Sequence, residues 1–125
     1  MNTNRYYVVP DIHGMGSLLE KTLTKLYELE PNGCKVIFLG DYIDRGKENV
    51  KVLELVRNPP ENFQFVTLKG NHEAMFVDAA NNRHEYYDYK ALKELVEEYN
   101  IEETVEWMDK LPIIHFEWTN VFVHG

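Results

Sequence analysis

The sequence predicts an α/β fold, and two observations support that prediction. Short apolar runs alternate along the chain with longer segments whose apolar residues recur at helical spacing. The run Val36–Leu39 is apolar without alternation, which is typical of a parallel strand covered on both faces. A β-α-β-α-β order of these elements favours a parallel sheet with right-handed crossovers.

The first half of the chain is expected to supply three strands and two helices. The strands are predicted at Tyr6–Val9, Val36–Leu39 and Phe63–Leu68. Ser17–Glu20 has the S-x-x-E form of a capping box, so it starts a helix that ends before Pro31. The second helix is predicted over Lys47–Arg57, and the two prolines that follow stop it.

The second half is expected to be more helical and to end in a hairpin. Helices are predicted at His72–Ala80, at Asp88–Tyr99 and after Asn100, whose side chain caps the helix start with Glu103 at the third position. The polar, tyrosine-rich segment Asn81–Asp88 is predicted to be a surface loop. The strands of the hairpin are predicted at Ile113–Trp118 and Val121–Val123, joined at Thr119-Asn120.

Length and composition exclude several classes of protein. At 125 residues the chain is short for more than one domain, so residues 1–125 are expected to form a single one. A net charge of −8 disfavours binding to nucleic acid or to an anionic membrane. The only cysteine, Cys34, excludes an internal disulfide framework and a four-cysteine zinc site. With no apolar stretch near ~20 residues, the expected location is the cytoplasm.

Each of the first three predicted strands is followed by a polar cluster. The clusters are Asp11–Gly14, Gly40–Gly46 and Gly70–Glu73. In an open α/β sheet the loops at the carboxyl ends of the strands converge and bind ligands. Aspartate, histidine and asparagine together suit a divalent metal of borderline to hard character, whereas the absence of thiolates disfavours iron–sulfur or copper(I) sites. Each cluster alone is more often a cap or a surface ion pair, but three clusters at strand ends predict a site.

In order and spacing these clusters resemble the signature motifs of the calcineurin-like metallophosphoesterases. They are most similar to the phosphoprotein phosphatase branch, which includes small bacterial and phage serine/threonine phosphatases. The resemblance extends from Tyr6 to about Phe76, with Pro10 where the family usually has glycine, and Lys110–Gly125 resembles a later strand pair. It implies a β-sandwich flanked by helices, of which this chain has the N-terminal β-α-β-α-β portion and lacks the C-terminal strands.

The resemblance also implies two divalent metal ions and a role for each site residue. The implied metal ligands are Asp11, His13, Asp41, Asn71 and His124. Asp11 and His13 would bind the first ion, Asn71 and His124 the second, and Asp41 would bridge both. Manganese is the expected metal, with iron, zinc and nickel as alternatives.

Three further residues are implied to act on the substrate. His72 would donate a proton to the leaving oxygen, Asp44 would hold its imidazole, and Arg45 would contact the phosphate. The expected function is hydrolysis of phosphoserine, phosphothreonine or phosphotyrosine in proteins by direct attack of metal-bound hydroxide. The alternatives are a hydrolase of dinucleoside polyphosphates or other small phosphoesters, and a non-catalytic module that binds metal or phosphate.

The chain stops at Gly125, where the family continues with a Gly-His-Thr-type motif and a second phosphate-binding arginine. We therefore expect it to be a truncated form or the N-terminal part of a longer protein, whose isolated fragment could be inactive. The other histidines do not replace the absent one, because His84 is expected to be exposed and His115 to be packed and hydrogen-bonded. Absent strands would leave an open sheet edge, through which the chain could associate.

Overall fold

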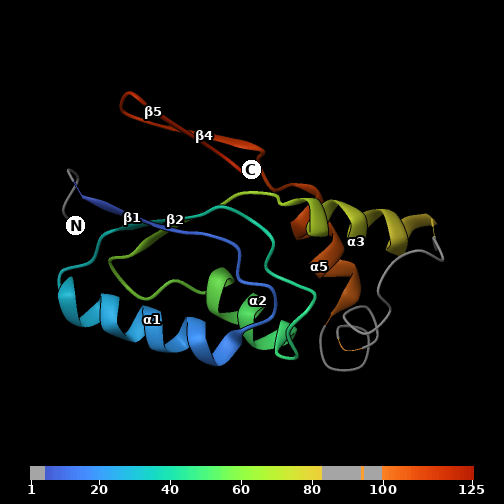
Figure 1. Cartoon of the computed structure of the whole chain (residues 1–125), viewed down its shortest axis with the longest axis horizontal. Coiled ribbons are helices and arrows are strands. Elements are labelled where there is room, and N and C mark those ends of the chain that lie inside the picture. Colours follow the sequence, from blue (N-terminus) through green and yellow to red (C-terminus); the bar gives the residue numbers. More distant parts are fainter. Residues whose placement is uncertain (1–4, 83–93, 95–99) are drawn as a thin grey trace.

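A parallel sheet of three strands organises the molecule. The computed structural model describes residues 5–82, 94 and 100–125 (Figure 1). The strands are β1 (Tyr6–Val9), β2 (Lys35–Phe38) and β3 (Gln64–Thr67). Their order is β1-β2-β3, with Val8 opposite Ile37 and Ile37 opposite Val66. The predicted parallel β-α-β-α-β unit is confirmed, with strand ends that differ from the prediction by a residue or so.

Two helices cover the same face of this sheet. They are α1 (Gly16–Leu29) and α2 (Asn49–Arg57), and they pack against each other below the strands in Figure 1. Both crossovers advance in the same direction along the sheet, so right-handed connections place both helices on one side. Leu23 and Leu53 are buried there against Val36 and Phe38 of the central strand. This layer is the hydrophobic core.

The capping box predicted at Ser17–Glu20 is wrong. The helix α1 begins at Gly16, and its N-cap Met15 makes no side-chain capping bond. Instead the Glu48 carboxylate accepts hydrogen bonds from the Ser17 backbone N–H at 3.0 Å and from its hydroxyl at 2.9 Å. These two bonds lower the pKa of Glu48. A charged carboxylate from a distant segment satisfies both donors and suits the positive end of the helix, so it replaces the local partner.

Two more helices, α3 (Asn71–Asn82) and α5 (Ile101–Asp109), lie side by side beyond the sheet. The Asn100 side chain accepts a hydrogen bond from the Glu103 N–H, which confirms the predicted cap. Asn81 and Asn82 extend α3, where a loop was predicted to begin. The rest of that loop with His84, and all but Glu94 of the helix predicted at Asp88–Tyr99, lie outside the described residues. Over the described ranges no helix is both long and apolar enough to cross a membrane.

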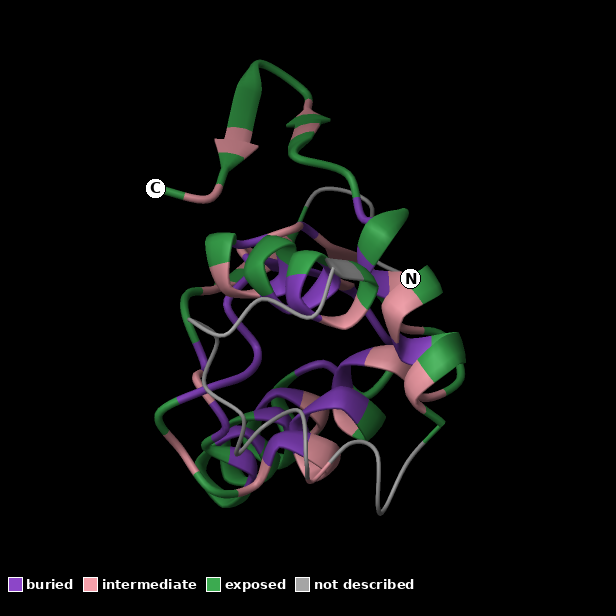
Figure 2. Ribbon diagram, turned by 90° about the vertical axis from the view of Figure 1, so that its right-hand side faces the viewer, coloured by how far each residue is buried: buried purple, intermediate pink, exposed green. Residues whose placement is uncertain are grey.

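The antiparallel hairpin of β4 (Ile114–Glu117) and β5 (Asn120–Val123) lies on the sheet face opposite α1 and α2. The Phe122 and Tyr6 rings meet edge to face with centroids 5.6 Å apart, and the Lys35 ammonium lies 2.8 Å from the Glu117 carboxylate. As expected, His115 is half-buried and hydrogen-bonded, with its Nε2 3.0 Å from Glu117. The other side of the hairpin is exposed, as Figure 2 shows.

Candidate metal centre

The polar side chains that follow the strands meet at one end of the sheet. Asp11 and His13 follow β1, Asp41 follows β2, and Asn71 is the first residue of the helix after β3. The Asp41 carbonyl accepts hydrogen bonds from the Ile12 and His13 N–H groups, at 3.0 and 2.9 Å. These bonds fasten the first loop to the second, because both loops leave neighbouring parallel strands at the same edge.

Backbone carbonyls orient two of the histidines. His13 Nδ1 lies 3.0 Å from the Ile43 carbonyl, and His124 Nδ1 lies 3.0 Å from the Leu39 carbonyl. A carbonyl can only accept, so the proton of each ring is assigned to Nδ1. The Nε2 lone pairs then face the Asp41 carboxylate, with Oδ2 3.5 Å from His13 and 3.2 Å from His124. Histidines that bind metals are commonly held in this way.

Acceptor atoms gather around Asp41, whose exposed fraction is 3%. Asp11 Oδ2 lies 3.7 Å from His13 Nε2, and Asp11 Oδ1 lies 3.5 Å from His124 Nδ1. Two groups have ligand atoms within 4.8 Å of one another, and Asp41 belongs to both: His13, Asp41 and His72, and Asp11, Asp41 and His124. Carboxylates and imidazoles are a donor set that divalent cations accept. The residues of each group therefore fit a divalent cation, and Asp41 is common to both groups.

Asn71 can serve the same site in either orientation of its amide. Its Oδ1 lies 2.9 Å from His124 Nε2, so two acceptors face each other without a proton between them. A cation bound by both atoms would resolve that contact. If the amide is turned over, its NH₂ donates instead to His124 Nε2 at 2.9 Å and to Asp41 Oδ2 at 3.0 Å. In one orientation the Asn71 amide thus offers an oxygen to a cation, and in the other it donates to the same acceptors through nitrogen.

His72 and Asp44 form a hydrogen-bonded pair beside the acceptor cluster. His72 Nδ1 lies 2.7 Å from Asp44 Oδ2, and the His72 backbone N–H donates to Asp41 Oδ1 at 2.9 Å. The His72 ring also meets the His13 ring edge to face, with centroids 4.8 Å apart. Arg45 comes next in the chain, with an exposed side chain and a left-handed φ of 75°. The predicted imidazole–carboxylate contact is thus present in the fold.

Glu73 was not assigned a role from the sequence, yet it joins the second loop to the third. Its carboxylate is 0% exposed and accepts N–H bonds from Asp41 at 2.7 Å, Tyr42 at 2.9 Å and Gly70 at 2.9 Å. Burial raises the pKa of Glu73, and the three donors oppose that rise. The sequence signal nearest to Glu73 is Gly70. A Cβ at Gly70 would collide with Asp41 and would lie 2.8 Å from Glu73 Oε1, so a glycine is needed where the two loops meet.

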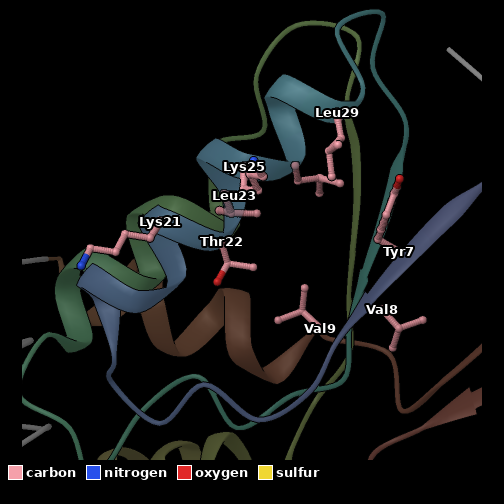
Figure 3. A pocket seen from close by; sticks show the side chains of 9 residues that line it. Tyr7, Val8, Val9, Lys21, Thr22, Leu23, Lys25 and Leu29 are labelled. Atoms are coloured by element: carbon pink, nitrogen blue, oxygen red, sulfur yellow. The ribbon is translucent and has the colours of Figure 1, made fainter.

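Two apolar cavities lie along β1 and α1, and the smaller one reaches the cluster. A cavity of about 450 Å³ runs between β1 and α1, where Tyr7 and Val9 face Leu29 with Lys21 and Lys25 at the rim (Figure 3). A second cavity of about 230 Å³ reaches Asp11 itself, next to Met15 and Leu18. The acceptor cluster is therefore flanked by apolar surface on the β1 side of the molecule.

Comparisons with known proteins agree with this geometry. The calcineurin-like phosphoesterase family matches residues 5–125. The chain is 48% identical over 75 residues to serine/threonine-protein phosphatase 2 of Salmonella typhimurium, covering 58% of this chain and 31% of that protein. It is 28% identical over 119 residues to a symmetrical bis(5'-nucleosyl)-tetraphosphatase of Actinobacillus succinogenes, covering 92% of this chain and 42% of that one.

A structural neighbour shows the same fold. It is the crystal structure of a hypothetical protein from Pyrococcus horikoshii, with a TM-score of 0.66 and 21% identity. The match covers 86% of this chain and 48% of that one. The chain spans about a third of the length of the phosphatases of Salmonella typhimurium and Escherichia coli that it matches.

Proposed function

The chain belongs to the calcineurin-like phosphoesterase family, and from that membership we propose that it carries the metal site of a protein phosphatase. The substrates would be phosphoserine and phosphothreonine in proteins, with phosphotyrosine as a further candidate, and the location would be the cytoplasm. One observation supports the proposal above all. The lone pairs of His13, His124 and Asp41 converge next to the Asp44–His72 pair.

Each side chain has a task in the proposed hydrolysis. Asp11 and His13, whose Oδ2 and Nε2 lie 3.7 Å apart, would hold one divalent cation. His124 and Asn71, whose Nε2 and Oδ1 lie 2.9 Å apart, would hold the other, and Asp41, close to both histidines, would serve both. Such ions lower the pKa of water toward about 7 and so supply hydroxide near neutral pH. Manganese is the proposed metal, with iron, zinc and nickel as alternatives. Direct attack on phosphorus needs no phosphoenzyme.

His72 would supply the proton that the leaving oxygen needs. Its Nδ1 is engaged by Asp44, so Nε2 is the atom that carries the proton to the leaving alkoxide. A general acid placed in this way contributes about 10²–10⁴-fold to the rate. The Arg45 guanidinium would bind two phosphate oxygens through its planar pair of N–H groups.

The test measures phosphate release from a phosphoserine peptide and from p-nitrophenyl phosphate. The protein is first treated with a chelator and then given manganese, iron, zinc or nickel in separate samples. We expect metal-dependent hydrolysis that is highest with manganese. Trapping of a covalent phosphoryl-enzyme would contradict the direct mechanism. Metal binding without hydrolysis of either substrate would contradict the phosphatase and favour a module that only binds metal or phosphate.

A second candidate substrate is a dinucleoside polyphosphate. The match to the tetraphosphatase of Actinobacillus succinogenes spans 92% of the chain, further than the more identical match to the Salmonella phosphatase. Rates on the phosphoserine peptide and on diadenosine tetraphosphate would separate the two. A higher kcat/KM on the tetraphosphate would overturn the protein phosphatase assignment and leave the metal site intact.

A further inference from the structure

Asn49, the first residue of α2, has an exposed fraction of 3% and lies next to the loop that carries Asp44. Its side-chain Oδ1 accepts a hydrogen bond from the buried Asp44 N–H at 3.0 Å. Asp44 in turn binds the His72 ring through Oδ2. We infer that Asn49 is a positioning residue, which holds Asp44 and through it aims the imidazole of His72.

The backbone at Asp44 needs such a hold. Asp44 and Arg45 have φ angles of 73° and 75°, so two successive residues with a Cβ are left-handed. This conformation is disfavoured for residues other than glycine and persists only when surrounding contacts stabilise it. The bond to Asn49 is a contact of that kind, because it fixes the direction of the peptide N–H at Asp44 itself.

The amide of Asn49 is fixed at its other end as well. Its Nδ2 donates to Glu94 Oε2 at 2.8 Å, while Glu94 Oε1 accepts the Val50 N–H at 3.1 Å. Nitrogen faces a carboxylate and oxygen faces an N–H, so the two ends of the amide are not interchangeable. A Cβ at Gly14 would lie 2.8 Å from Asn49 Oδ1, so the amide is also packed against the first loop. An apolar side chain of equal size could fill this space but could not accept the Asp44 N–H.

The consequence for hydrolysis rests on the proposed function. A misdirected His72 matters most when the leaving oxygen is basic and needs its proton, as with the serine alkoxide of a phosphoserine peptide. It matters little for a nitrophenolate, which leaves without protonation. Loss of Asn49 should therefore lower kcat on the peptide by tenfold or more, within the ~10²–10⁴-fold span of a general acid. KM on both substrates, and kcat on p-nitrophenyl phosphate, should change little.

The experiment compares Asn49→Ala with Asn58→Ala. Asn58 follows the same helix, is exposed, and donates to the Glu54 carbonyl at 2.7 Å, so it is a matched control. Asn49→Leu, which fills the same space without an acceptor, replaces the alanine variant if that one does not fold. The double variant Asn49→Asp with Glu94→Gln exchanges acid and amide, and so restores the acceptor for Asp44 and the contact between positions 49 and 94. The double variant should recover the wild-type kcat on the phosphoserine peptide.

The first readout needs neither metal nor activity. In the metal-free protein, NMR follows the His72 Nδ1 proton and the hydrogen exchange of the Asp44 amide. We expect both signatures to be lost in Asn49→Ala and retained in Asn58→Ala and in the double variant. Unchanged signatures in Asn49→Ala would overturn the inference. The inference would also be overturned if the signatures were lost but kcat fell equally on the phosphoserine peptide and on p-nitrophenyl phosphate. If the wild type hydrolyses neither substrate, the proposed function fails and the NMR result alone decides on Asn49.

Discussion

Asp41 is the residue on which the proposed metal site depends. Its carboxylate belongs to both groups of potential ligands, and it also accepts the backbone N–H of His72. Its own N–H is held by Glu73 and its carbonyl by the first loop. The same residue thus offers ligand oxygens and joins the loops, and these two roles can be tested separately.

Asp41→Asn keeps the size of the side chain and removes its charge. We expect the affinity for Mn²⁺ to fall by at least about tenfold. Even mutation of a residue that only supports a metal ligand commonly lowers metal affinity about 10–100-fold. Isothermal titration calorimetry on the metal-free protein measures this. Asp109→Asn, on the exposed end of α5, is the control and should bind as the wild type does. Equal affinities in the two variants would remove Asp41 from the site.

Glu73→Gln tests the joining role. The amide cannot accept at both of its ends, so at least one buried N–H among Asp41, Tyr42 and Gly70 loses its partner. A buried donor left unsatisfied costs about 1–3 kcal/mol, so the free energy of unfolding in urea should fall by that amount. The exposed Glu28→Gln on α1 should change it little. No difference between the two variants would mean that the loops hold together without Glu73.

At the scale of elements, the hairpin of β4 and β5 is attached to the sheet by side-chain contacts that include the Tyr6–Phe122 ring pair and the hydrogen bond from Asn120 to the Tyr6 hydroxyl. The Lys35–Glu117 ion pair also joins the hairpin to the sheet, and His115 lies against the same carboxylate. The hydrogen bond from Lys35, followed by that from His115, lowers the pKa of Glu117. The attachment is therefore predicted to depend on pH.

The sign follows from the direction of that shift. A carboxyl whose pKa is lower in the folded state stabilises the fold above its ordinary pKa and loses the effect as pH falls through the folded value. Glu117→Gln should thus be less stable than the wild type at pH 7. The two should converge as pH falls below about 4.3. Urea unfolding at several pH values measures the difference, and Glu61→Gln, exposed before β3, is the control. A difference that stays constant from pH 7 to the lowest pH at which the wild type remains folded would show that the ion pair is not its cause.

The starts of α1 and α5 show why a helix is easier to predict than the group that caps its N-terminus. The Asn100 side chain caps α5 by accepting the N–H of Glu103, and this was predicted because the two residues lie within one helical turn of each other in the chain. The start of α1 was predicted from an equally local pattern, but Glu48, far along the chain, displaced the expected partner. A local motif holds only where no distant group competes for the same N–H donors.

At the scale of the whole molecule, one apolar surface stands out. Ile114, Phe116, Val121 and Val123 lie on the outward side of the hairpin, and Phe116 is 65% exposed. On the described residues β1 pairs only with β2, and the apolar cavity of Figure 3 runs along its other edge. Exposed edges and apolar patches favour association. We propose that this chain associates with itself through these surfaces.

Phe116→Thr should weaken that association. Sedimentation velocity over a range of concentrations should show a weight-average mass that rises with concentration for the wild type and rises less for the variant. Met75→Thr, an exposed apolar position on α3, is the matched control and should behave as the wild type. A wild type that stays monomeric at every concentration would contradict the proposal.

The order of strands and helices and the residue types at the ends of the strands could be read from the sequence. Periodicity and turn residues act between near neighbours, so Val36–Leu39 and Asp11–Gly14 were interpretable by themselves. Only the tertiary structure decided which lone pairs meet at Asp41 and which buried groups hold the loops. Glu73 accepts from a loop 32 residues away, and Asn49 is held by Glu94, 45 residues away. Contacts over such separations depend on how the sheet brings its loops together, and no local pattern encodes that.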